Sequence, residues 1–515
     1  MSFFKNGIII IFHTLLSRIF GLARELCIAN FFGTSLYADA INTALRFPNL
    51  FRRIVGEGAL SSVFVPIYSE KLQQSESKAA KFASEIFTIM FLSLSILCAL
   101  LIIFMPYVVK LNAPGFILDS KKFEIAVLLS RITMPYMVFI SLCALIGGIH
   151  NSNGRFGAFA FLPIILNISI ITASLLDFSD KENKSILIAI SVIIGGIIQL
   201  IFMIYTSMSY NIRYGFVFVY KLSSDSIRFF KKMIPAALGS SVTQLNLFLS
   251  TAIASISPGA ISILSYADRI YQLPLSIIGI CFGTLLLPSL SKYYNSKQYK
   301  EALTLQTNAV RLSLFLSIAC SFGIIVLAHP MIHIIYERGN FLEIDTKKTS
   351  DALAIFALGL PAFILNKILI PIFYARHNAK TPFRIAIATM IVNFVANFSL
   401  IWHFEHLGIA IGTVISSWFN IAITIYYLKK TGYNIVEKNI WFYIFKVIIS
   451  ALIMAISVHS LFLLNINFLY EETFRTKFFY LVLIVFFGIL VYFATALLIK
   501  AIYISDIKSL LSKKN

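Results

Sequence analysis

Apolar runs of about 20 residues, separated by short polar gaps, recur along almost the whole of this 515-residue chain. A run of that length crosses the hydrocarbon core of a bilayer as an α-helix. The pattern predicts about fourteen helices, near residues 7–32, 36–54, 83–109, 123–149, 158–177, 185–207, 229–254, 261–289, 303–328, 351–375, 383–403, 407–428, 440–464 and 477–501. The gaps leave no room for a separate soluble domain, so we predict an all-α polytopic membrane protein.

Composition and charge support this class. Hydrophobic residues make up 58% of the chain and charged residues 13%, whereas soluble domains have about 25% charged residues. The net charge of +20 does not indicate nucleic-acid binding, because the lysines and arginines are spread over many short loops. Roughly 25 of them fall on the side of the N-terminus and about 10 on the other, so the positive-inside rule predicts that both termini are cytoplasmic.

The spacing of cysteines and histidines indicates neither a metal site nor a catalytic centre. The five cysteines lie mostly in apolar stretches and form no C-x-x-C pair, which argues against zinc and against a disulfide frame. His329 and His333 have helical i, i+4 spacing, and His403 and His406 are three apart, but neither pair has an H-E-x-x-H pattern. We expect these histidines to cap helices at the outer surface.

An internal similarity between the two halves predicts the domain organisation. Segment 46–48, followed by 65–70, has a counterpart in 269–274, followed by 287–292. In each copy an arginine precedes a proline within the span, and a second proline closes the helix before a polar loop. Helix-closing prolines are common, but a true repeat would give two parallel six-helix lobes and a helical pair with a cytoplasmic tail, over residues 1–220, 221–430 and 431–515. Transporters built in this way bind substrate between the repeats, near the bilayer midplane.

Charged side chains inside the predicted spans carry the functional information. Arg18, Arg24, Arg46 and Arg52 lie within the first fifty or so residues. A cationic side chain at membrane depth costs about 2.5 to 3.5 kcal/mol on insertion scales, so it usually faces a wet cavity and has a function. Arginine stays charged, and its planar fork binds phosphate oxygens in pairs, so several arginines in one cavity suit a pyrophosphate.

The first-half arginines also have structural explanations. Arg52 and Arg53 end the second predicted helix and could snorkel to the headgroups. Arg24 could pair with an acid such as Asp39 and hold helices together. Arg18 is harder to explain in this way, because it lies well inside the first span.

The second half offers one comparable basic site. Asp268 and Arg269 lie well inside the predicted helix 261–289, where a local ion pair is the structural alternative. Lys367 lies toward the middle of a long predicted helix with no basic neighbour, which makes it a weaker candidate.

With these residues in hand, the chain closely resembles the MurJ/MviN family of lipid II flippases, which belongs to the MATE-like exporter superfamily. The resemblance rests on motifs that are ordered along both predicted lobes: Ser17-Arg18, Gly21-Leu22-Ala23-Arg24-Glu25, Phe32-Gly33, Asp39-Ala40, Pro48-Asn49, Arg52-Arg53, Glu57-Gly58-Ala59, Asn153-Gly154-Arg155-Phe156, Leu162-Pro163 with Asn167, Tyr266 to Pro274, Tyr374-Ala375-Arg376 and Lys380-Thr381-Pro382. The last 85 residues match in helix count and not in motif.

The resemblance implies a fold of two six-helix lobes around a central cavity, plus two extra helices. It also implies the function, which is to move lipid II, the undecaprenyl-pyrophosphate-linked precursor of peptidoglycan, from the inner to the outer leaflet of the bacterial cytoplasmic membrane. The counterparts of the family's essential cavity arginines are Arg18, Arg24, Arg52 and Arg269. The residues expected to support the cavity are Ser17, Asp39, Glu57 and Asp268.

We expect alternating access, in which the lobes rock while the arginines hold the pyrophosphate and the polyprenyl tail stays in lipid. Helices 440–464 and 477–501 would offer the tail an apolar groove. Each elementary charge moved through 100 mV is worth about 2.3 kcal/mol, so an interior-negative potential would return the empty, positively charged cavity to the cytoplasmic side. No cofactor or metal is expected, and the counter-ion is left open. The expected partners are lipid II and the bilayer, with the chain as a monomer and cell-wall synthesis proteins as candidates.

Three other functions compete with this hypothesis. A related exporter could carry another polyprenyl-linked saccharide or a small molecule, although cationic drugs would favour carboxylates in the cavity. An integral membrane enzyme acting on polyprenyl phosphates would need a positioned acid, base or metal cluster. A scaffold without transport activity would bear the cost of buried charge without benefit.

Overall fold

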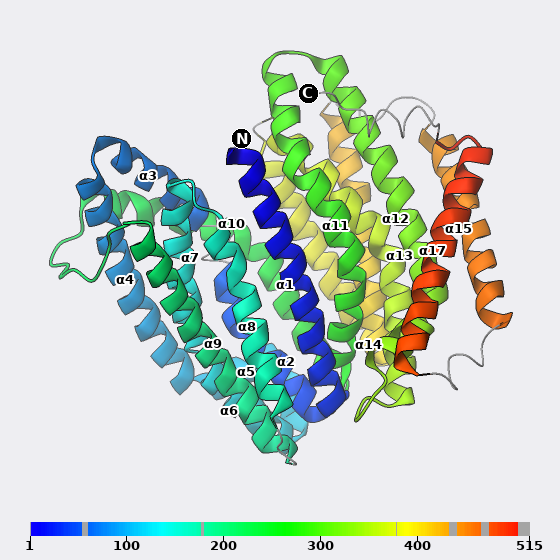
Figure 1. Cartoon of the computed structure of the whole chain (residues 1–515), viewed down its shortest axis with the longest axis horizontal. Coiled ribbons are helices and arrows are strands. Elements are labelled where there is room, and N and C mark those ends of the chain that lie inside the picture. Colours follow the sequence, from blue (N-terminus) through cyan, green and yellow to red (C-terminus); the bar gives the residue numbers. More distant parts are fainter. Residues whose placement is uncertain are drawn as a thin grey trace. The chain divides into compact units, whose positions relative to one another are not determined.

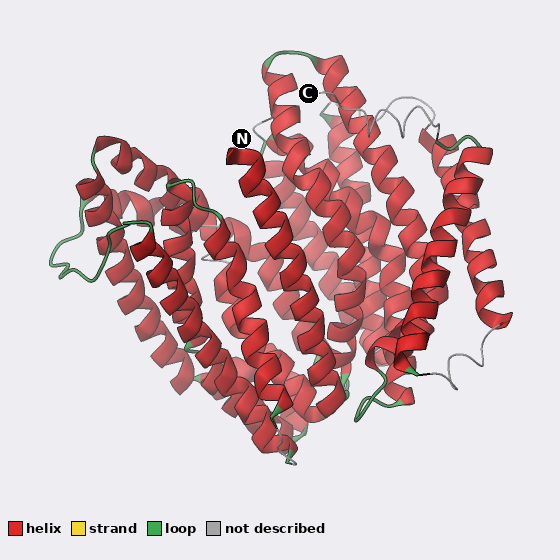
Figure 2. Ribbon diagram, viewed as in Figure 1, coloured by secondary structure: helices red, strands yellow, loops and turns green. Residues whose placement is uncertain are grey.

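The computed structural model describes residues 2–53, 60–176, 180–376, 378–431, 440–464 and 473–502. This part of the chain is almost entirely helical and contains no strand (Figure 2). Nine of the described helical segments are long and apolar enough to cross a membrane. The predicted all-α polytopic fold is therefore confirmed, while the number of fourteen crossings stays a prediction, as the helices that carry the candidate arginines lie outside these nine.

By its internal packing the chain forms two compact units, of which the first comprises Met1–Ser262 and Arg338–Phe341. Its helices are α1 (Ser2–Phe32), α2 (Leu36–Phe51), α3 (Ser61–Gln74), α4 (Glu76–Ile103), α5 (Met105–Asn112), the short η2 (Pro114–Leu118), α6 (Ser120–Thr133), α7 (Tyr136–Ser152), α8 (Gly157–Leu175), α9 (Lys181–Ser209) and α10 (Ser224–Ala254). Helix α1 packs on α8, α8 on α9, and α2 on α6 (Figure 1).

The second unit comprises Ile263–Glu337 and Leu342–Asn515. It contains most of α11 (Ala260–Asn295), followed by α12 (Tyr299–Tyr336), α13 (Glu343–Tyr374), α14 (Lys380–Lys430), α15 (Ile440–Leu464) and α17 (Phe474–Leu498). Helix α12 packs on α13, and α13 packs on α14. The pair α15 and α17 packs on α12, where the hydroxyl of Tyr492 donates to the carbonyl of Phe315 over 2.7 Å.

The helix bounds follow the apolar runs closely, with three differences. The predicted span 83–109 is divided, because α4 ends at Ile103 and α5 begins at Met105. The stretch predicted as span 123–149 lies within one candidate span, Ser120–Ser152. Inside it α6 ends at Thr133 and α7 begins at Tyr136 after Pro135, which has no N–H for the helical ladder. Helix α3 occupies part of what the sequence predicted as a loop. The two spans predicted at 383–403 and 407–428 agree with α14, in which Glu405, with φ 47° and ψ −131°, is non-helical and separates two helices.

Two prolines inside helices leave carbonyls that neighbouring helices satisfy. Pro48 cannot donate to the carbonyl of Ala44, four residues earlier, and this carbonyl accepts the hydroxyl of Thr133 on α6 over 3.0 Å. In the second unit Pro361 likewise cannot donate to the carbonyl of Ala357, four residues earlier. The hydroxyl of Ser321 on α12 donates to the Ala357 carbonyl over 2.6 Å. Both carbonyls left open by these prolines are thus paired with a hydroxyl from the adjacent helix, as buried backbone groups in an apolar medium require.

The packing units differ from the predicted lobes in one helix. Helix α10 begins after residue 220, within the predicted second lobe, but it packs on α3, α4 and α5 and belongs to the first unit. Packing does not test the repeat symmetry from which the lobes at 1–220, 221–430 and 431–515 were inferred. These boundaries therefore stay a prediction.

Candidate functional site

Arg24 on α1 is held by two partners that fix the orientation of its guanidinium. Its Nη2 lies 2.5 Å from Oε1 of Glu25, and its Nη1 donates to Oδ1 of Asn167 on α8 over 3.2 Å. The Arg24 side chain is 13% exposed and that of Glu25 is 2% exposed. Because neutralised and hydrogen-bonded charges are tolerated in an apolar medium far better than isolated ones, Glu25 and Asn167 allow the arginine to remain in the span.

Asn167 also connects Arg24 to the segment that carries Ser17 and Arg18. Its Nδ2 donates to the carbonyl of Ser17 over 3.3 Å. The Ser17 hydroxyl is turned back onto α1, where it donates to the carbonyl of Thr14 over 2.8 Å. Arg18 is half-buried. One asparagine on α8 therefore bonds α1 at two levels and brings two of the predicted site residues, Ser17 and Arg24, into one network.

The basic residues at the end of α2 have different environments. The Nη1 of Arg46 donates to the hydroxyl of Thr251 on α10, so this guanidinium links two helices of the first unit. The Nε of Arg52 donates to Oδ1 of Asn49 over 3.4 Å, and Arg52 is half-buried, whereas Arg53 is exposed. The part of Arg52 in binding stays a prediction. Glu57, predicted to support the cavity, lies outside the described residues.

Asp39 is fully buried at the start of α2 and accepts four bonds. The ammonium of Lys122 on α6 lies 2.6 Å from its Oδ2, which also accepts the N–H of Gly259 over 3.0 Å. Its Oδ1 accepts both the N–H and the hydroxyl of Ser262, over 2.9 Å and 2.6 Å. Asp39 thus joins α2, α6 and the start of α11. The acidic partner of Arg24 is Glu25 and not Asp39. The expected part of Asp39 in supporting the cavity stays a prediction.

Asp268 and Arg269 lie on the polar face of α11 in the second unit. Tyr266, Ala267, Ile270 and Tyr271 are buried on one side of the helix. Ser265, Asp268, Arg269 and Gln272 occupy the opposite side at 100° per residue and are only half-buried. Gln272 Nε2 donates to Asp268 Oδ2, one turn along this face. The helix therefore buries its aromatic side in the unit and presents a basic and an acidic group together on the other side.

Sequence reasoning missed the partners of these residues. Lys122 was counted among the loop lysines, although it is buried against Asp39 and lies over the ring of Phe116 at 4.3 Å from the centroid. Asn167 was noted only as part of a family motif. A signal was present, because it is an amide inside an otherwise apolar predicted span, and such side chains need a partner in lipid.

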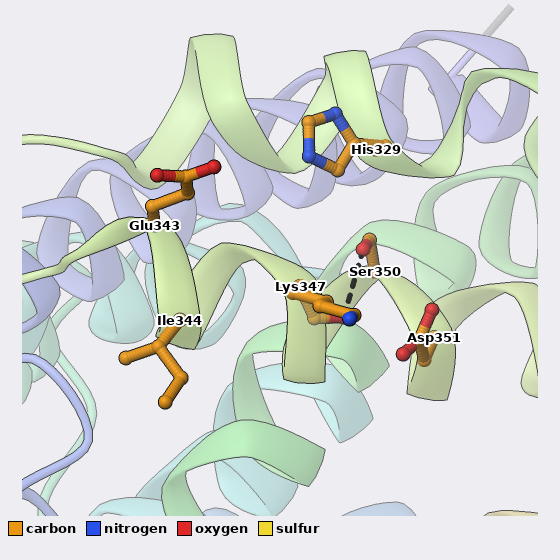
Figure 3. A pocket seen from close by; sticks show the side chains of 6 residues that line it. All are labelled: His329, Glu343, Ile344, Lys347, Ser350 and Asp351. Carbon is orange, nitrogen blue, oxygen red and sulfur yellow. Dashed lines mark hydrogen bonds between the residues drawn. The ribbon is translucent and has the colours of Figure 1, made fainter.

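A separate pocket of about 530 Å³ lies between α12 and the start of α13 (Figure 3). It is lined by His329, Glu343, Ile344, Lys347, Ser350 and Asp351. The neighbouring His333 lies in the last turn of α12, and its Nδ1 lies 2.8 Å from the carboxylate of Glu337, the residue that follows the end of this helix. Within the described ranges, no group of three or more His, Cys, Asp or Glu side chains could hold a metal ion.

Comparison with known sequences places the chain among flippases. Residues 28–487 match the family described as lipid II flippase MurJ. A protein named probable lipid II flippase MurJ from Rickettsia prowazekii (strain Madrid E) is 44% identical over 502 residues, which cover 98% of this chain and 99% of the relative. A protein of the same name from Rhizobium tropici is 36% identical over 445 residues, which cover 85% and 83%. The lipid II flippase MurJ of Burkholderia cenocepacia is 34% identical, with 84% and 85% covered.

Solved structures agree with this assignment. A lipid II flippase MurJ in an inward closed conformation matches with a TM-score of 0.81 and 28% identity, over 98% of this chain and 99% of that chain. An inward-facing multidrug resistance MATE family transporter matches with a TM-score of 0.68 at 12% identity, over 82% and 97%, which shows a shared fold alone. Because the relatives are named as flippases, the expectation of a transporter and not an enzyme is confirmed. The resemblance carried by the sequence motifs is also confirmed, and the chain belongs to the lipid II flippase MurJ family.

Proposed function

We propose that this chain moves lipid II from the cytoplasmic to the outer leaflet and binds its pyrophosphate with Arg18, Arg24, Arg52 and Arg269. The main support is the environment of Arg24. Two of its five N–H donors are used by Asn167 and Glu25, while the side chain keeps some exposure. A guanidinium whose orientation is fixed in this way loses little entropy when it binds an anion.

The proposed mechanism is alternating access. The cavity opens to the cytoplasm, the arginines bind the pyrophosphate, and the protein changes to an outward-open state that releases it on the other side. Three arginines of the set lie in the first unit and Arg269 lies in the second. In the proposed mechanism the arginines hold the pyrophosphate while the lobes rock and the polyprenyl tail stays in lipid.

The membrane potential is the proposed energy source. The empty cavity carries excess positive charge, whereas pyrophosphate neutralises it, so the potential acts mainly on the return of the empty carrier. An interior-negative potential pulls that positive charge toward the cytoplasm, at about 2.3 kcal/mol per elementary charge and 100 mV. This argument requires the orientation predicted from loop charge, with both termini on the cytoplasmic face of the bacterial inner membrane.

The polyprenyl tail is proposed to stay in lipid beside α15 and α17. Both helices expose large apolar side chains, among them Ile456 and Phe486. An isoprenoid chain can lie along such a surface without leaving the hydrocarbon, so only the polar headgroup needs the cavity. We expect the protein to act as a monomer.

The second candidate is export of another polyprenyl-linked saccharide or of a small molecule, which the MATE-like fold also accommodates. The pairing of Glu25 with Arg24 counts against a cationic drug, because the carboxylate that would attract it is already neutralised. Depletion of this protein in its own cells, followed by measurement of lipid II on each leaflet, separates the candidates. Accumulation of lipid II on the inner leaflet supports the proposal, and unchanged exposure on the outer leaflet contradicts it.

A further inference from the structure

The segment between α9 and α10 forms neither helix nor strand and is bonded to two side chains of α4. We call residues 213–222 the strap. Its Gly215 N–H donates to the hydroxyl of Ser84 over 3.1 Å, and its Val217 N–H donates to the hydroxyl of Thr88, also over 3.1 Å. Two residues of extended chain advance about 6.6 Å and four residues of helix about 6 Å, so alternate N–H groups of the strap meet successive turns of α4. The spacing of these two bonds therefore matches the spacing of successive turns of α4.

Further contacts fix both ends of the strap. The Tyr214 hydroxyl donates to Ser207 on α9 over 2.9 Å, and burial raises the Tyr214 pKa to about 12, so the donor stays protonated. Just past the other end, the N–H of Ser223, the N-cap of α10, donates to Oε1 of Glu85 over 2.7 Å. The Phe216 ring lies 5.2 Å from that of Phe87. Tethering at both ends makes the strap a defined surface element.

The outward face of the strap is aromatic and basic. Phe218 and Tyr220 are 95% and 94% exposed, whereas Phe216, which packs on Phe87 and Phe91 of α4, is 65% exposed. Arg213 and Lys221 are exposed beside them. Each aromatic side chain offers about 150 to 250 Å² of surface, so the row forms an apolar patch of the size that marks an interaction site.

The position of the strap along α4 identifies what covers this patch. Above Thr88 the exposed side of α4 is largely apolar, with Leu92, Ile96 and Ile103 turned outward as in a lipid-facing span, and its exposed Ser93 donates to the carbonyl of Met90. Counting back from Ile103, about 30 Å of hydrocarbon takes about 20 residues and ends near Ser84. The strap therefore crosses α4 where hydrocarbon meets the headgroups, the level at which Tyr and Trp collect and basic side chains meet phosphates.

We propose that the strap is an interfacial anchor, in which Phe218 and Tyr220 enter the headgroup layer and Arg213 and Lys221 bind anionic lipid headgroups. In the orientation predicted from loop charge, this is the cytoplasmic leaflet. The inference does not depend on the substrate, because it uses only the first unit and its place in a bilayer. A soluble protein partner on the same face is the alternative occupant.

Nitroxide accessibility tests the depth of the strap. Single cysteines replace Phe218 or Tyr220 in the full chain after the five native cysteines are changed to alanine. Spin-labelled protein is reconstituted in vesicles of phosphatidylethanolamine and phosphatidylglycerol, with Ser77→Cys and Ile96→Cys on α4 as references for water and hydrocarbon. We expect the ratio of collisions with oxygen to collisions with a water-soluble nickel chelate to be several-fold above the Ser77 value and below the Ile96 value. A ratio equal to that at Ser77 overturns the proposal and leaves the face free for a soluble partner.

Charge neutralisation tests headgroup binding separately. In the parent, replacing neutral lipid by phosphatidylglycerol is expected to deepen the label at residue 218, and high salt should reverse this shift. The Arg213→Gln/Lys221→Gln double variant should lose the lipid dependence, whereas Lys78→Gln, at an exposed lysine of α4, should keep it. If the double variant still responds to phosphatidylglycerol as the parent does, the assignment of these two residues to anionic headgroups is wrong.

Discussion

Lys122 and Asp39 form an ion pair of 2.6 Å in which the lysine side chain is 8% exposed and the aspartate 0%. The pair connects α6 to the start of α2, and Asp39 extends the connection to Gly259, just before α11, and to Ser262 in the first turn of α11. In a buried pair the loss of one partner is expensive, because the other charge is then left without compensation.

We predict that Lys122→Met and Asp39→Asn each destabilise the protein by about 3 to 5 kcal/mol, with the double variant less destabilised than the sum of the two. The reason is that the double variant leaves no isolated charge in the interior. Unfolding of the purified protein in detergent, followed as a double-mutant cycle, measures this coupling. Additive effects would mean that the two groups do not depend on each other.

We expect Asn167 to affect transport through its bond to Arg24, without contacting the substrate itself. Asn167→Leu removes the acceptor of a charged donor, a bond worth about 1.5 to 3 kcal/mol, so we expect transport to fall by roughly tenfold or more. The rate at which lipid II becomes exposed on the outer leaflet measures transport. The control is Gln199→Leu, which also removes a buried amide. The amide of Gln199 donates to the carbonyl of Leu162 and bonds no arginine. Equal losses in both variants would assign Asn167 a packing role only.

The helices were predictable because crossing a bilayer demands about 20 apolar residues, whatever the tertiary structure. Helix α8 begins at Gly157 and ends at Leu175, close to the bounds 158–177 expected from the apolar run. The break between α6 and α7 was not predicted, because the apolar character continues through Pro135 although the helix does not. An apolar run indicates burial in lipid, but it does not show where the helix within it is interrupted.

The partners of the charged residues were less predictable than their positions. Glu25 could be proposed for Arg24 because it is adjacent in the chain, whereas Asn167 is 143 residues away. Lys122 is 83 residues from Asp39 and lies beside a polar gap, so the sequence assigned it to a loop. Such pairs depend on how helices pack, which a single sequence does not reveal. The roles of Arg18, Arg24, Arg52 and Arg269 in binding stay a prediction.

The hydroxyl of Thr133 should matter only while Pro48 leaves a carbonyl open. Thr133→Val keeps the shape of the side chain but removes the donor to Ala44, and we expect a loss of about 1 to 3 kcal/mol in unfolding free energy. Adding Pro48→Ala restores an N–H that can reach the same carbonyl, so Thr133→Val should cost less in that background. Equilibrium unfolding of the four proteins tests the coupling, and Ser321→Ala with Pro361→Ala repeats it in the second unit. An unchanged cost of Thr133→Val in the Pro48→Ala background would contradict this explanation.

Arginine and lysine variants distinguish charge from fork geometry at the proposed clamp. Arg18→Ala and Arg269→Ala should abolish lipid II translocation, whereas the lysine variants should retain part of it, because lysine keeps the charge and loses the paired donors. Arg53→Ala, at an exposed position, should translocate normally. Outer-leaflet lipid II in cells depleted of the native protein is the readout. Normal translocation in both alanine variants at Arg18 and Arg269 would refute the site assignment.

The proposed energy source makes a prediction that separates voltage from the proton gradient. Collapse of the potential with valinomycin and potassium should stall lipid II exposure, since the return of the positively charged empty cavity loses about 2.3 kcal/mol per charge and 100 mV. Nigericin, which exchanges protons for potassium and spares the potential, should have little effect. Protein levels and lipid II synthesis are followed in the same cells, so that a general metabolic effect is recognised. Unchanged exposure after depolarisation would show that the charge of the empty cavity does not drive its return, even if the arginines bind the pyrophosphate.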